Sequence, residues 1–294
     1  GEVRKRFGDG VLAMFPFEAG TGAGAEACRH ALAAARDAFN RLAEVWAAMS
    51  VSLLVIGAIA IAFFMDQIPY RDRIAAIGGL IALWGFHADA PQSRVPDAAA
   101  IAEWTNKQPR MADLAIENGT VSSSNPAVQL DLGGYAKGRA LDDAVAILKK
   151  HGVKNALVNI GGNVIALGAH GDRPWRVGIQ HPRQPGTLAT LDLHDGEAVG
   201  TSGDYQRYFE VEGKRYCHLI DPRSGSPASG MQSVTVLVSG AHAGTRSDAL
   251  SKPLFIDGAA RLAQHAARLG IADYLAVDFN GKVHVSPAMK ARLR

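Results

Sequence analysis

Cysteine is scarce in this sequence. Its 294 residues include two, Cys28 and Cys217, and they lie far apart. The two-residue spacing between cysteines that is typical of structural zinc sites does not occur. The composition therefore favours two free thiols and gives no support to a structural zinc site.

An excess of charge of one sign is missing as well. The 31 Lys and Arg residues nearly balance the 28 Asp and Glu residues, which leaves a formal net charge of +3. The longest basic run is Arg4-Lys5-Arg6. Because nucleic-acid binding needs a basic patch or stripe, we expect no nucleic acid as a partner. The length suffices for one large domain or two ordinary ones.

Charged residues are also absent from one long stretch. Residues 45–65 form a run of 21 residues in which Ser50 and Ser52 are the only hydroxyl groups. A helix needs about 20 apolar residues to cross the hydrocarbon core of a bilayer. The run therefore predicts a transmembrane helix, and a helix buried in a soluble core is the alternative that the pattern leaves open.

The segment before this run, residues 1–44, predicts a hairpin around Gly8-Asp9-Gly10 and an Ala-rich helix over 25–44. The pair resembles the hairpin and helix of class III nucleotide cyclases, in which the turn aspartate, here Asp9, binds a catalytic metal. In those cyclases a second metal carboxylate comes from a strand upstream of the hairpin, and this sequence, which starts at Gly1, shows no such strand. Two-metal chemistry needs both carboxylates. We therefore expect no cyclase activity, and Asp9 can equally be an ordinary turn residue.

The third segment, residues 77–294, alternates strand-like and helix-like patterns. Asn280-Gly281 adds a strong hairpin signal. This mixture predicts an α+β domain with a largely antiparallel sheet and flanking helices. Strands are expected at 155–160, 175–180, 188–193, 207–211 and 234–239, and helices at 96–104, 141–151, 248–255 and 259–269.

Four glycine-rich clusters follow one another in this segment. Each combines glycines with a few polar residues, and glycine lets a backbone approach a phosphate closely because it has no Cβ. Four clusters in order are hard to explain as turns alone, so we predict a phosphate-bearing ligand. The clusters are Asp131-Leu-Gly-Gly-Tyr-Ala-Lys-Gly138, Val158-Asn-Ile-Gly-Gly-Asn163, Thr201-Ser-Gly-Asp-Tyr205 and His218-Leu-Ile-Asp-Pro-Arg-Ser-Gly225.

Together with Leu83-Trp84-Gly85-Phe86 and the stretch 247–255, these clusters resemble the motifs of the ApbE family, the FAD:protein FMN transferases. The resemblance covers residues 77–294. It implies an enzyme that splits FAD at its diphosphate, releases AMP and esterifies FMN to a Thr or Ser hydroxyl of an acceptor protein. It also implies Mg²⁺ and, because the family usually works outside the cytoplasmic membrane, an inner-membrane protein with residues 77–294 in the periplasm.

The resemblance places the metal site on the helix predicted at 248–255. Asp248 matches the metal-binding aspartate of the family, and residues three and four positions later share its helix face. Gly134 matches a loop position whose carbonyl joins the metal, and Ser251 could take over ligation. We therefore predict Asp248 and Lys252 as catalytic residues and Gly134, Asp248 and Ser251 as metal ligands, although an aspartate at a helix start can also be a cap.

Further residues are predicted to contact FAD. Lys137 suits a phosphate, Asp131 could accept a bond from the ribose or adenine, and His218 has a supporting role. Thr201, Ser202 and Asp204 match an element that lines the same cleft, although such residues also cap turns. The predicted FAD-binding residues are Asp131, Gly133, Lys137, Thr201, His218 and Leu219.

Two departures from the family pattern bear on activity. Lys252 stands where the family has threonine, and a protonated lysine cannot ligate Mg²⁺. Its ammonium could instead neutralise the diphosphate directly. The region before Trp84 holds the cyclase-like hairpin and the apolar run in place of the early strands of the family. The alternative function is a non-catalytic flavin carrier or assembly subunit with the same fold.

Overall fold

The computed structural model describes most of the chain: residues 2–7, 11–16, 33, 36–37, 40, 68, 70–88, 93–118 and 120–294. Within these ranges, no helix is both long and apolar enough to cross a membrane. The apolar run at 45–65 and the turn residue Asp9 lie outside the described residues. The transmembrane helix and the metal role of Asp9 therefore stay predictions.

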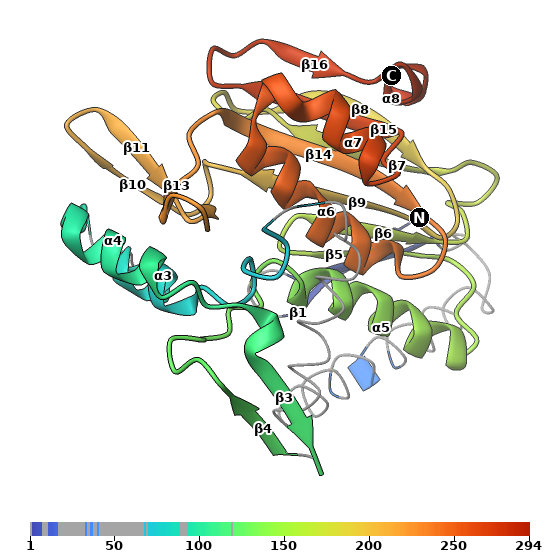
Figure 1. The fold of residues 1–294 in the computed structure, drawn as a ribbon. Helices are drawn as coiled ribbons and strands as arrows, with labels where there is room; N and C mark the ends of the chain where they lie inside the picture. Colours follow the sequence, from blue (N-terminus) through green and yellow to red (C-terminus); the bar gives the residue numbers. More distant parts are fainter. Residues whose placement is uncertain are drawn as a thin grey trace.

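An eight-stranded antiparallel sheet forms the centre of the fold (Figure 1). The strand order is β1-β2-β5-β6-β9-β14-β15-β16, and each strand is antiparallel to its neighbours. The inner strand β14 is buried along nearly its whole length because both faces of the sheet are covered. The strands are β1 Glu2–Phe7, β2 Val11–Pro16, β5 Ala156–Ile160, β6 Asn163–Leu167, β9 Glu197–Gly203, β14 Met231–Ser239, β15 Asp273–Asp278 and β16 Val283–Val285.

Helices cover one face of this sheet. Helix α5 (Ala136–Lys150) packs on β5 and β6, and α6 (Ala243–Asp257) packs on β9, β14 and α5. Helix α7 (Leu262–Arg268) follows on the same face (Figure 1). Because α6 is enclosed between α5 and the sheet, nearly all of its side chains are buried, including those of Asp248 and Lys252. Buried polar groups need partners, so the polar residues of α6 must be paired within the protein.

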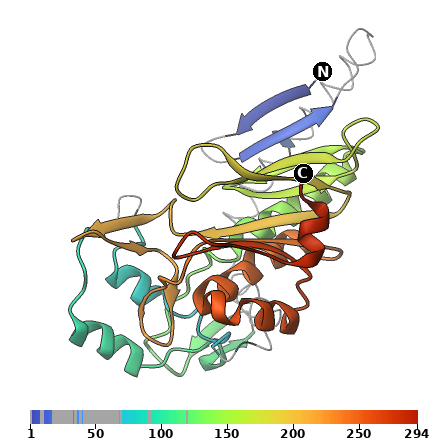
Figure 2. The same ribbon diagram turned by 90° about the horizontal axis from the view of Figure 1, so that it is seen from above.

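A β-hairpin and a short helix cover the opposite face. The hairpin consists of β7 (Trp175–Gln180) and β8 (Thr187–Leu193), and α8 (Pro287–Arg292) lies beside it. Trp175, Leu191 and Met289 form the centre of the apolar cluster between this layer and the sheet. Seen from above, the β1–β2 hairpin lies at one edge of the sheet (Figure 2).

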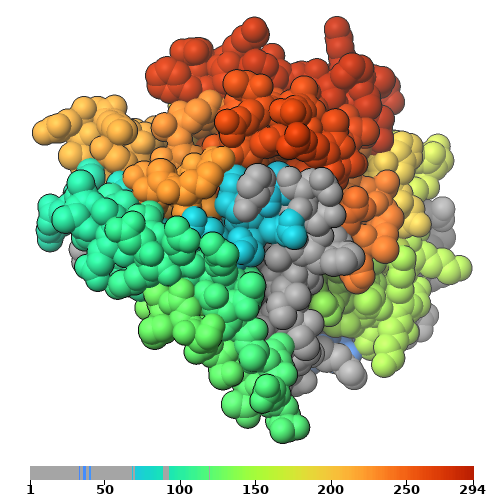
Figure 3. Space-filling view, in the orientation of Figure 1, coloured from blue at the N-terminus to red at the C-terminus, as the bar shows by residue number. Residues whose placement is uncertain are grey.

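The remaining elements form a side lobe, defined as residues 77–123 together with 207–227. Trp84 stacks on Tyr216 and Phe86 on Phe209, with ring centroids 5.5 and 5.6 Å apart. Gly85 has φ 77°, a left-handed conformation that favours glycine. Figure 3 shows the two parts of the lobe side by side. Its elements are α3 Gly78–Leu83, α4 Ala98–Asn106, the 3₁₀ turn Met111–Asp113, β3 Leu114–Glu117, β4 Thr120–Ser123, β10 Tyr208–Val211, β11 Lys214–Cys217, β12 Ile220–Asp221 and β13 Ser226–Pro227.

The predicted α+β class with an antiparallel sheet is confirmed, and β7 has the predicted bounds. Helix α5 begins at Ala136, not at 141, so Lys137 lies in the first turn of a helix and not in a loop. The residue patterns do not predict β9, and the strand-to-loop element that the resemblance implies at Thr201 corresponds to its end. Strand β2 pairs with β5, so the hairpin of segment 1–44 extends the main sheet. The division of the chain into three segments stays a prediction.

Candidate functional site

A cleft of about 400 Å³ opens beside the first turn of α5, in the size range of small-molecule sites. Its walls come from α3, the loop before α5, the end of β9, residues 203–207 and 218–220, and α6. The cleft brings together eight of the ten predicted site residues. They are Asp131, Gly133, Gly134, Lys137, Thr201, His218, Leu219 and Lys252. The other two, Asp248 and Ser251, are buried on α6 next to Lys252.

A close contact between α5 and α6 fixes the position of Asp248. A Cβ on Gly138 would lie 2.3 Å from the carbonyl oxygen of Gly244, so this approach requires glycine. Asp142 accepts hydrogen bonds of 2.9 Å from the N–H groups of Gly244 and Thr245. These N–H groups begin α6 and lack partners within the helix. The Gly138 N–H donates to Oδ2 of Asp248 at 2.9 Å, which orients the carboxylate.

Asp248 is 1 % exposed and lies between two lysines. Lys252 donates to its Oδ1 at 2.5 Å and to its backbone carbonyl at 2.7 Å. Nζ of Lys137 is 3.6 Å from the same Oδ1. Burial alone would raise the pKa of Asp248, but the two lysines and the Gly138 N–H outweigh this effect and hold that pKa below its usual value. Asp248 is therefore a carboxylate at neutral pH and positions two cationic side chains at the cleft.

The lysine that pairs with Asp248 is itself buried. Burial lowers the pKa of Lys252, and the carboxylate of Asp248 opposes that shift. Its aliphatic chain passes over Gly134, where an added Cβ would lie 2.9 Å from Cε. The glycine loop before α5 therefore makes room for the lysine as well as for a ligand.

The predicted metal ligands do not form an open metal site. Oδ2 of Asp248 accepts the Gly138 N–H, and Oδ1 accepts the Lys252 ammonium. The Ser251 hydroxyl donates to the Asp248 carbonyl at 2.9 Å and lies 2.8 Å from the Ser202 hydroxyl. No group of three or more His, Cys, Asp and Glu side chains in the described part of the chain is placed to hold a metal. The arrangement fits an ammonium group and does not fit Mg²⁺, and the metal roles stay predictions.

Residues around the lysines shape the polar side of the cleft. Lys137 donates to the Gly133 carbonyl at 3.0 Å, and Asp131 accepts the Gly133 N–H at 2.8 Å. The ring Nδ1 of His218 is 3.2 Å from the Arg207 carbonyl. Burial lowers the pKa of His218 to about 4, so the ring is neutral at pH 7. When Nδ1 donates to that carbonyl, Nε2 remains as a proton acceptor.

The apolar side of the cleft is the part that the sequence patterns miss. The sequence patterns also did not predict one charged lining residue, Arg207. Its guanidinium donates to the carbonyls of Phe86 and Ala88 at 2.5 and 3.1 Å and so connects the start of β10 with the segment after α3. The motif around Trp84 gave the one signal for this side, because Phe86 lines the cleft. The other apolar lining residues are isolated positions without a motif. They are Ile74, Ile77, Ile81, Tyr205, Ile220 and Ile256.

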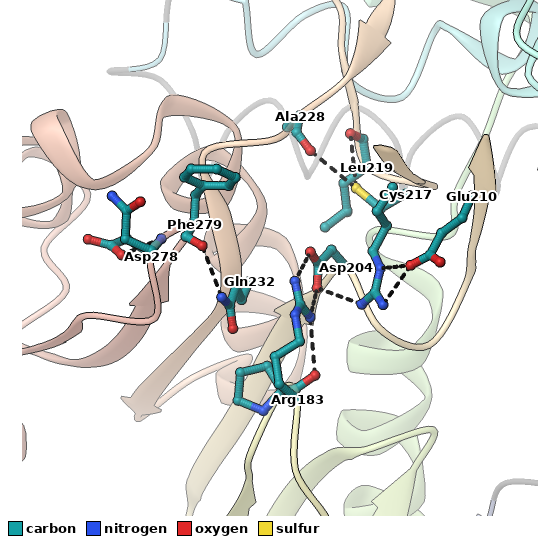
Figure 4. A network of polar contacts seen from close by, with 12 residues as sticks. Arg183, Asp204, Glu210, Cys217, Leu219, Ala228, Gln232, Asp278 and Phe279 are labelled. Atoms are coloured by element: carbon teal, nitrogen blue, oxygen red, sulfur yellow. Dashed lines mark hydrogen bonds and ion pairs between the residues drawn. The ribbon is translucent and has the colours of Figure 1, made fainter. Parts of the chain in front are cut away.

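The cluster that begins at Thr201 divides between two hollows. Thr201 lines the cleft, and its hydroxyl is 2.9 Å from that of Thr235 on β14. Asp204 lines a second hollow, where Arg183 binds both of its oxygens at 2.7 and 2.6 Å (Figure 4). Arg215 lies 3.8 Å from the same carboxylate. The prediction that Asp204 lines the cleft of the lysines is therefore wrong, because two guanidinium groups hold it on another surface.

Known proteins resemble this chain in sequence and in fold. The family model of the ApbE family matches residues 74–275. A FAD:protein FMN transferase of Rhodobacter capsulatus is 45% identical over 218 residues, which are 74% of this chain and 41% of that protein. A FAD:protein FMN transferase of Klebsiella pneumoniae is 29% identical over 276 residues, which are 86% of this chain and 77% of that protein. The chain thus spans less than half the length of the Rhodobacter relative.

The fold is also similar to a solved structure. The crystal structure of the ApbE protein of Thermotoga maritima superposes with a TM-score of 0.80 at 26% identity. The match covers 100% of this chain and 99% of that structure.

Proposed function

The chain belongs to the ApbE family, and on that premise we propose that it is a FAD:protein FMN transferase. It would move FMN from FAD to a Thr or Ser hydroxyl of an acceptor protein and release AMP. The Rhodobacter and Klebsiella relatives, both FAD:protein FMN transferases, support this reaction.

One observation carries the proposal: a single cleft combines paired cations with an apolar wall. Lys137 and Lys252 stand at the glycine loop before α5, and Ile77 and Ile81 line the same cleft. A dinucleotide such as FAD needs both surfaces, because its diphosphate is anionic and its ring systems are flat and largely apolar. The glycines at 133 and 134 allow the diphosphate to approach the backbone.

The proposed chemistry is a displacement at the phosphorus of the FMN half. The acceptor oxygen forms a new P–O bond, the P–O bond to AMP breaks, and the acceptor hydroxyl loses its proton. Lys137 and Lys252 would hold the phosphate oxygens and offset the charge on the departing AMP. His218 is the proposed proton acceptor, because its ring is neutral and its Nε2 is unprotonated in the tautomer whose Nδ1 donates to the Arg207 carbonyl.

Magnesium is implied by the family resemblance but does not fit the side chains around Asp248, so the proposed displacement relies on the two lysines.

For the location, we propose an inner-membrane protein with residues 77–294 in the periplasm. The uncharged run at 45–65 supports a membrane anchor. Protease treatment of spheroplasts tests this topology: degradation of the 77–294 part is expected, and its full protection would contradict the proposal.

The transferase proposal can be tested with purified chain, FAD and an acceptor domain that a flavin transferase relative modifies. We expect a fluorescent acceptor band on a denaturing gel, the mass of an FMN ester on the acceptor, and free AMP. An acceptor whose Thr or Ser is replaced by Ala should stay unlabelled. Lys149→Thr, which changes an exposed lysine at the end of α5, should label the acceptor as the unmodified protein does.

The alternative of a flavin carrier makes a different prediction in the same assay. A carrier would retain FAD intact through gel filtration and yield neither AMP nor a labelled acceptor. The observation that favours this alternative is the closed pair of Lys252 and Asp248, which stands in place of an open metal site.

A further inference from the structure

The ammonium group of Lys252 occupies the position at which the family resemblance expects a metal ion. Its Nζ is 2.5 Å from Oδ1 of Asp248 and 2.7 Å from the Asp248 carbonyl. A hard cation binds to carboxylate and carbonyl oxygens of this kind. The lysine thus takes up the oxygen atoms that a metal at Asp248 would need.

This lysine is built into the site and is not a mobile surface group. Lys252 is 8 % exposed, and its stem passes over Gly134. An ammonium group has three N–H donors, and two of them meet the acceptors on Asp248. Because Lys252 also lines the cleft, its third donor is available to a ligand oxygen.

The neighbouring hydroxyl group does not offer an alternative metal ligand. Ser251 donates to the Asp248 carbonyl at 2.9 Å, and its oxygen is 2.8 Å from the Ser202 hydroxyl. A metal at this point would have to displace a buried ammonium and disrupt two hydroxyl contacts. Displacing a buried charge from its partner is costly.

We propose that Lys252 is a resident cation that replaces the divalent metal, so that the protein binds the diphosphate of FAD, and transfers FMN, without Mg²⁺. The proposal rests on the proposed flavin transferase function. Lys252 then contacts the phosphate oxygens directly as a point charge, and Asp248 acts as a positioning residue that holds the ammonium in place.

Charge counting gives this arrangement a second testable property. With both lysines protonated, Lys137 and Lys252 contribute +2 and Asp248 contributes −1, which leaves +1 for these three groups, and the charges of Asp131 and Arg207 in the cleft lining cancel. With a divalent ion in place of the lysine ammonium, the same sum would be +2. The diphosphate should therefore be held by fewer positive charges, and its binding should weaken with salt but not with chelator.

The first experiment uses the unmodified protein. FAD affinity is measured by flavin fluorescence with EDTA and with excess Mg²⁺, and Mn²⁺ binding is measured by electron paramagnetic resonance. We expect the two FAD affinities to agree within about twofold and no Mn²⁺ to bind at the site. A gain in affinity of about tenfold or more with Mg²⁺, or a bound Mn²⁺ that FAD perturbs, would overturn the resident cation.

The second experiment changes the lysine. Lys252→Thr should gain Mn²⁺ binding and bind FAD in a Mg²⁺-dependent way, since the hydroxyl and the freed carboxylate can ligate a metal. Lys252→Met removes the charge at similar volume and should weaken FAD binding by about tenfold or more with EDTA and with Mg²⁺ alike. Lys149→Thr should match the unmodified protein. Thermal unfolding of each variant identifies any loss of fold, and in that case the unmodified protein alone decides.

The outcomes separate the two proposals. Wild-type affinity for FAD in folded Lys252→Met contradicts the role of the ammonium. A strict Mg²⁺ requirement of the unmodified protein overturns the resident cation while the transferase proposal survives. If the protein binds FAD neither with EDTA nor with Mg²⁺, the transferase proposal is overturned. The proposal that the Lys252 ammonium holds the diphosphate of FAD is then overturned as well.

Discussion

Two aspartates with similar surroundings show how the choice of cation separates a binding site from a structural contact. Asp248 and Asp204 are both nearly buried, and each faces two basic side chains. The partners of Asp248 are lysines, and those of Asp204 are arginines. The family resemblance assigned both aspartates to one cleft, yet Asp248 is buried beside the cleft-lining Lys252 and Asp204 lines a different hollow.

The geometry of the donors explains the difference. Arg183 binds both oxygens of Asp204 with a planar fork, and Arg215 is also tied to Glu210 at 2.9 Å (Figure 4). Such a fork is satisfied by one carboxylate. A lysine ammonium is a point charge with three donors, so Lys252 can hold Asp248 and still meet a phosphate. The lysine pair is therefore suited to a ligand and the arginine pair to fixing a loop.

Removal of the carboxylate at the lysine pair should have the largest effect. Asp248→Ala leaves a buried ammonium without its partner, which we expect to cost about 3–5 kcal/mol of unfolding free energy. Flavin transfer should fall by about 100-fold or more, because Lys252 is no longer held at the phosphates. Urea unfolding and the flavinylation assay measure the two effects. Asp248→Asn still accepts the Gly138 N–H, so its unfolding free energy should lie between those of Asp248→Ala and the unmodified protein. If Asp248→Ala is as stable as the unmodified protein, Asp248 and Lys252 do not form a stabilising buried pair.

The second lysine should affect the ligand more than the fold. Lys137 is 37 % exposed and donates to the Gly133 carbonyl. Because water reaches this lysine in the folded protein, water can replace the hydrogen bond of its ammonium when the side chain is removed. Lys137→Met should weaken FAD binding by about tenfold, the size of one charge-assisted hydrogen bond. The urea midpoint should hardly move. A large loss of stability with unchanged FAD affinity would make Lys137 a structural residue and break the comparison on the lysine side.

Local motifs were sufficient to predict much of the site. The i, i+4 spacing of Asp248 and Lys252 put both on one helix face, and the glycine motif directly before α5 indicated Lys137 in the first turn of that helix. The start of α5 could not be predicted, because Gly138 lies in its first turns and glycine disfavours a helix. The close approach to Gly244 in the tertiary structure explains why glycine is nevertheless used there.

Contacts between distant segments account for what remained hidden. Ile81 on α3 and Ile77 directly before it reach the cleft from more than a hundred positions before β9 and α6, and nothing in their local pattern marks them. Asp204 could not be placed because its orientation depends on Arg183, which lies in the loop between β7 and β8. Strand β9 contains Thr201 and Ser202, which are frequent in turns, and only its position between β6 and β14 makes it a strand.

A change at the arginine pair should alter stability and leave the ligand unaffected. Asp204→Asn removes the charge that two guanidinium groups share, and we expect a loss of about 1–3 kcal/mol of unfolding free energy. FAD affinity should stay within about twofold, because Asp204 does not line the cleft. Glu210→Gln is the matched control, since Glu210 is half-exposed and should change stability less. A strong effect of Asp204→Asn on FAD binding would mean that the two hollows are coupled.

The smallest effect is expected at Asp192, a further aspartate with two arginine partners, because water reaches both arginines. Hydrogen bonds from Arg294 and Arg176 hold the pKa of Asp192 below its usual value, although both arginines are more than half exposed. A carboxyl whose pKa is depressed by folding adds stability above its unfolded pKa of about 3.9, and this stability is lost as the pH falls through the lower folded value. Arg294→Ala should therefore cost less than about 1 kcal/mol at neutral pH, and the difference should vanish once Asp192 is protonated. Urea unfolding at a series of pH values measures this, with Lys290→Ala on the exposed side of α8 as control; a difference that persists in strong acid would assign the effect to the packing of the Arg294 side chain and not to its charge.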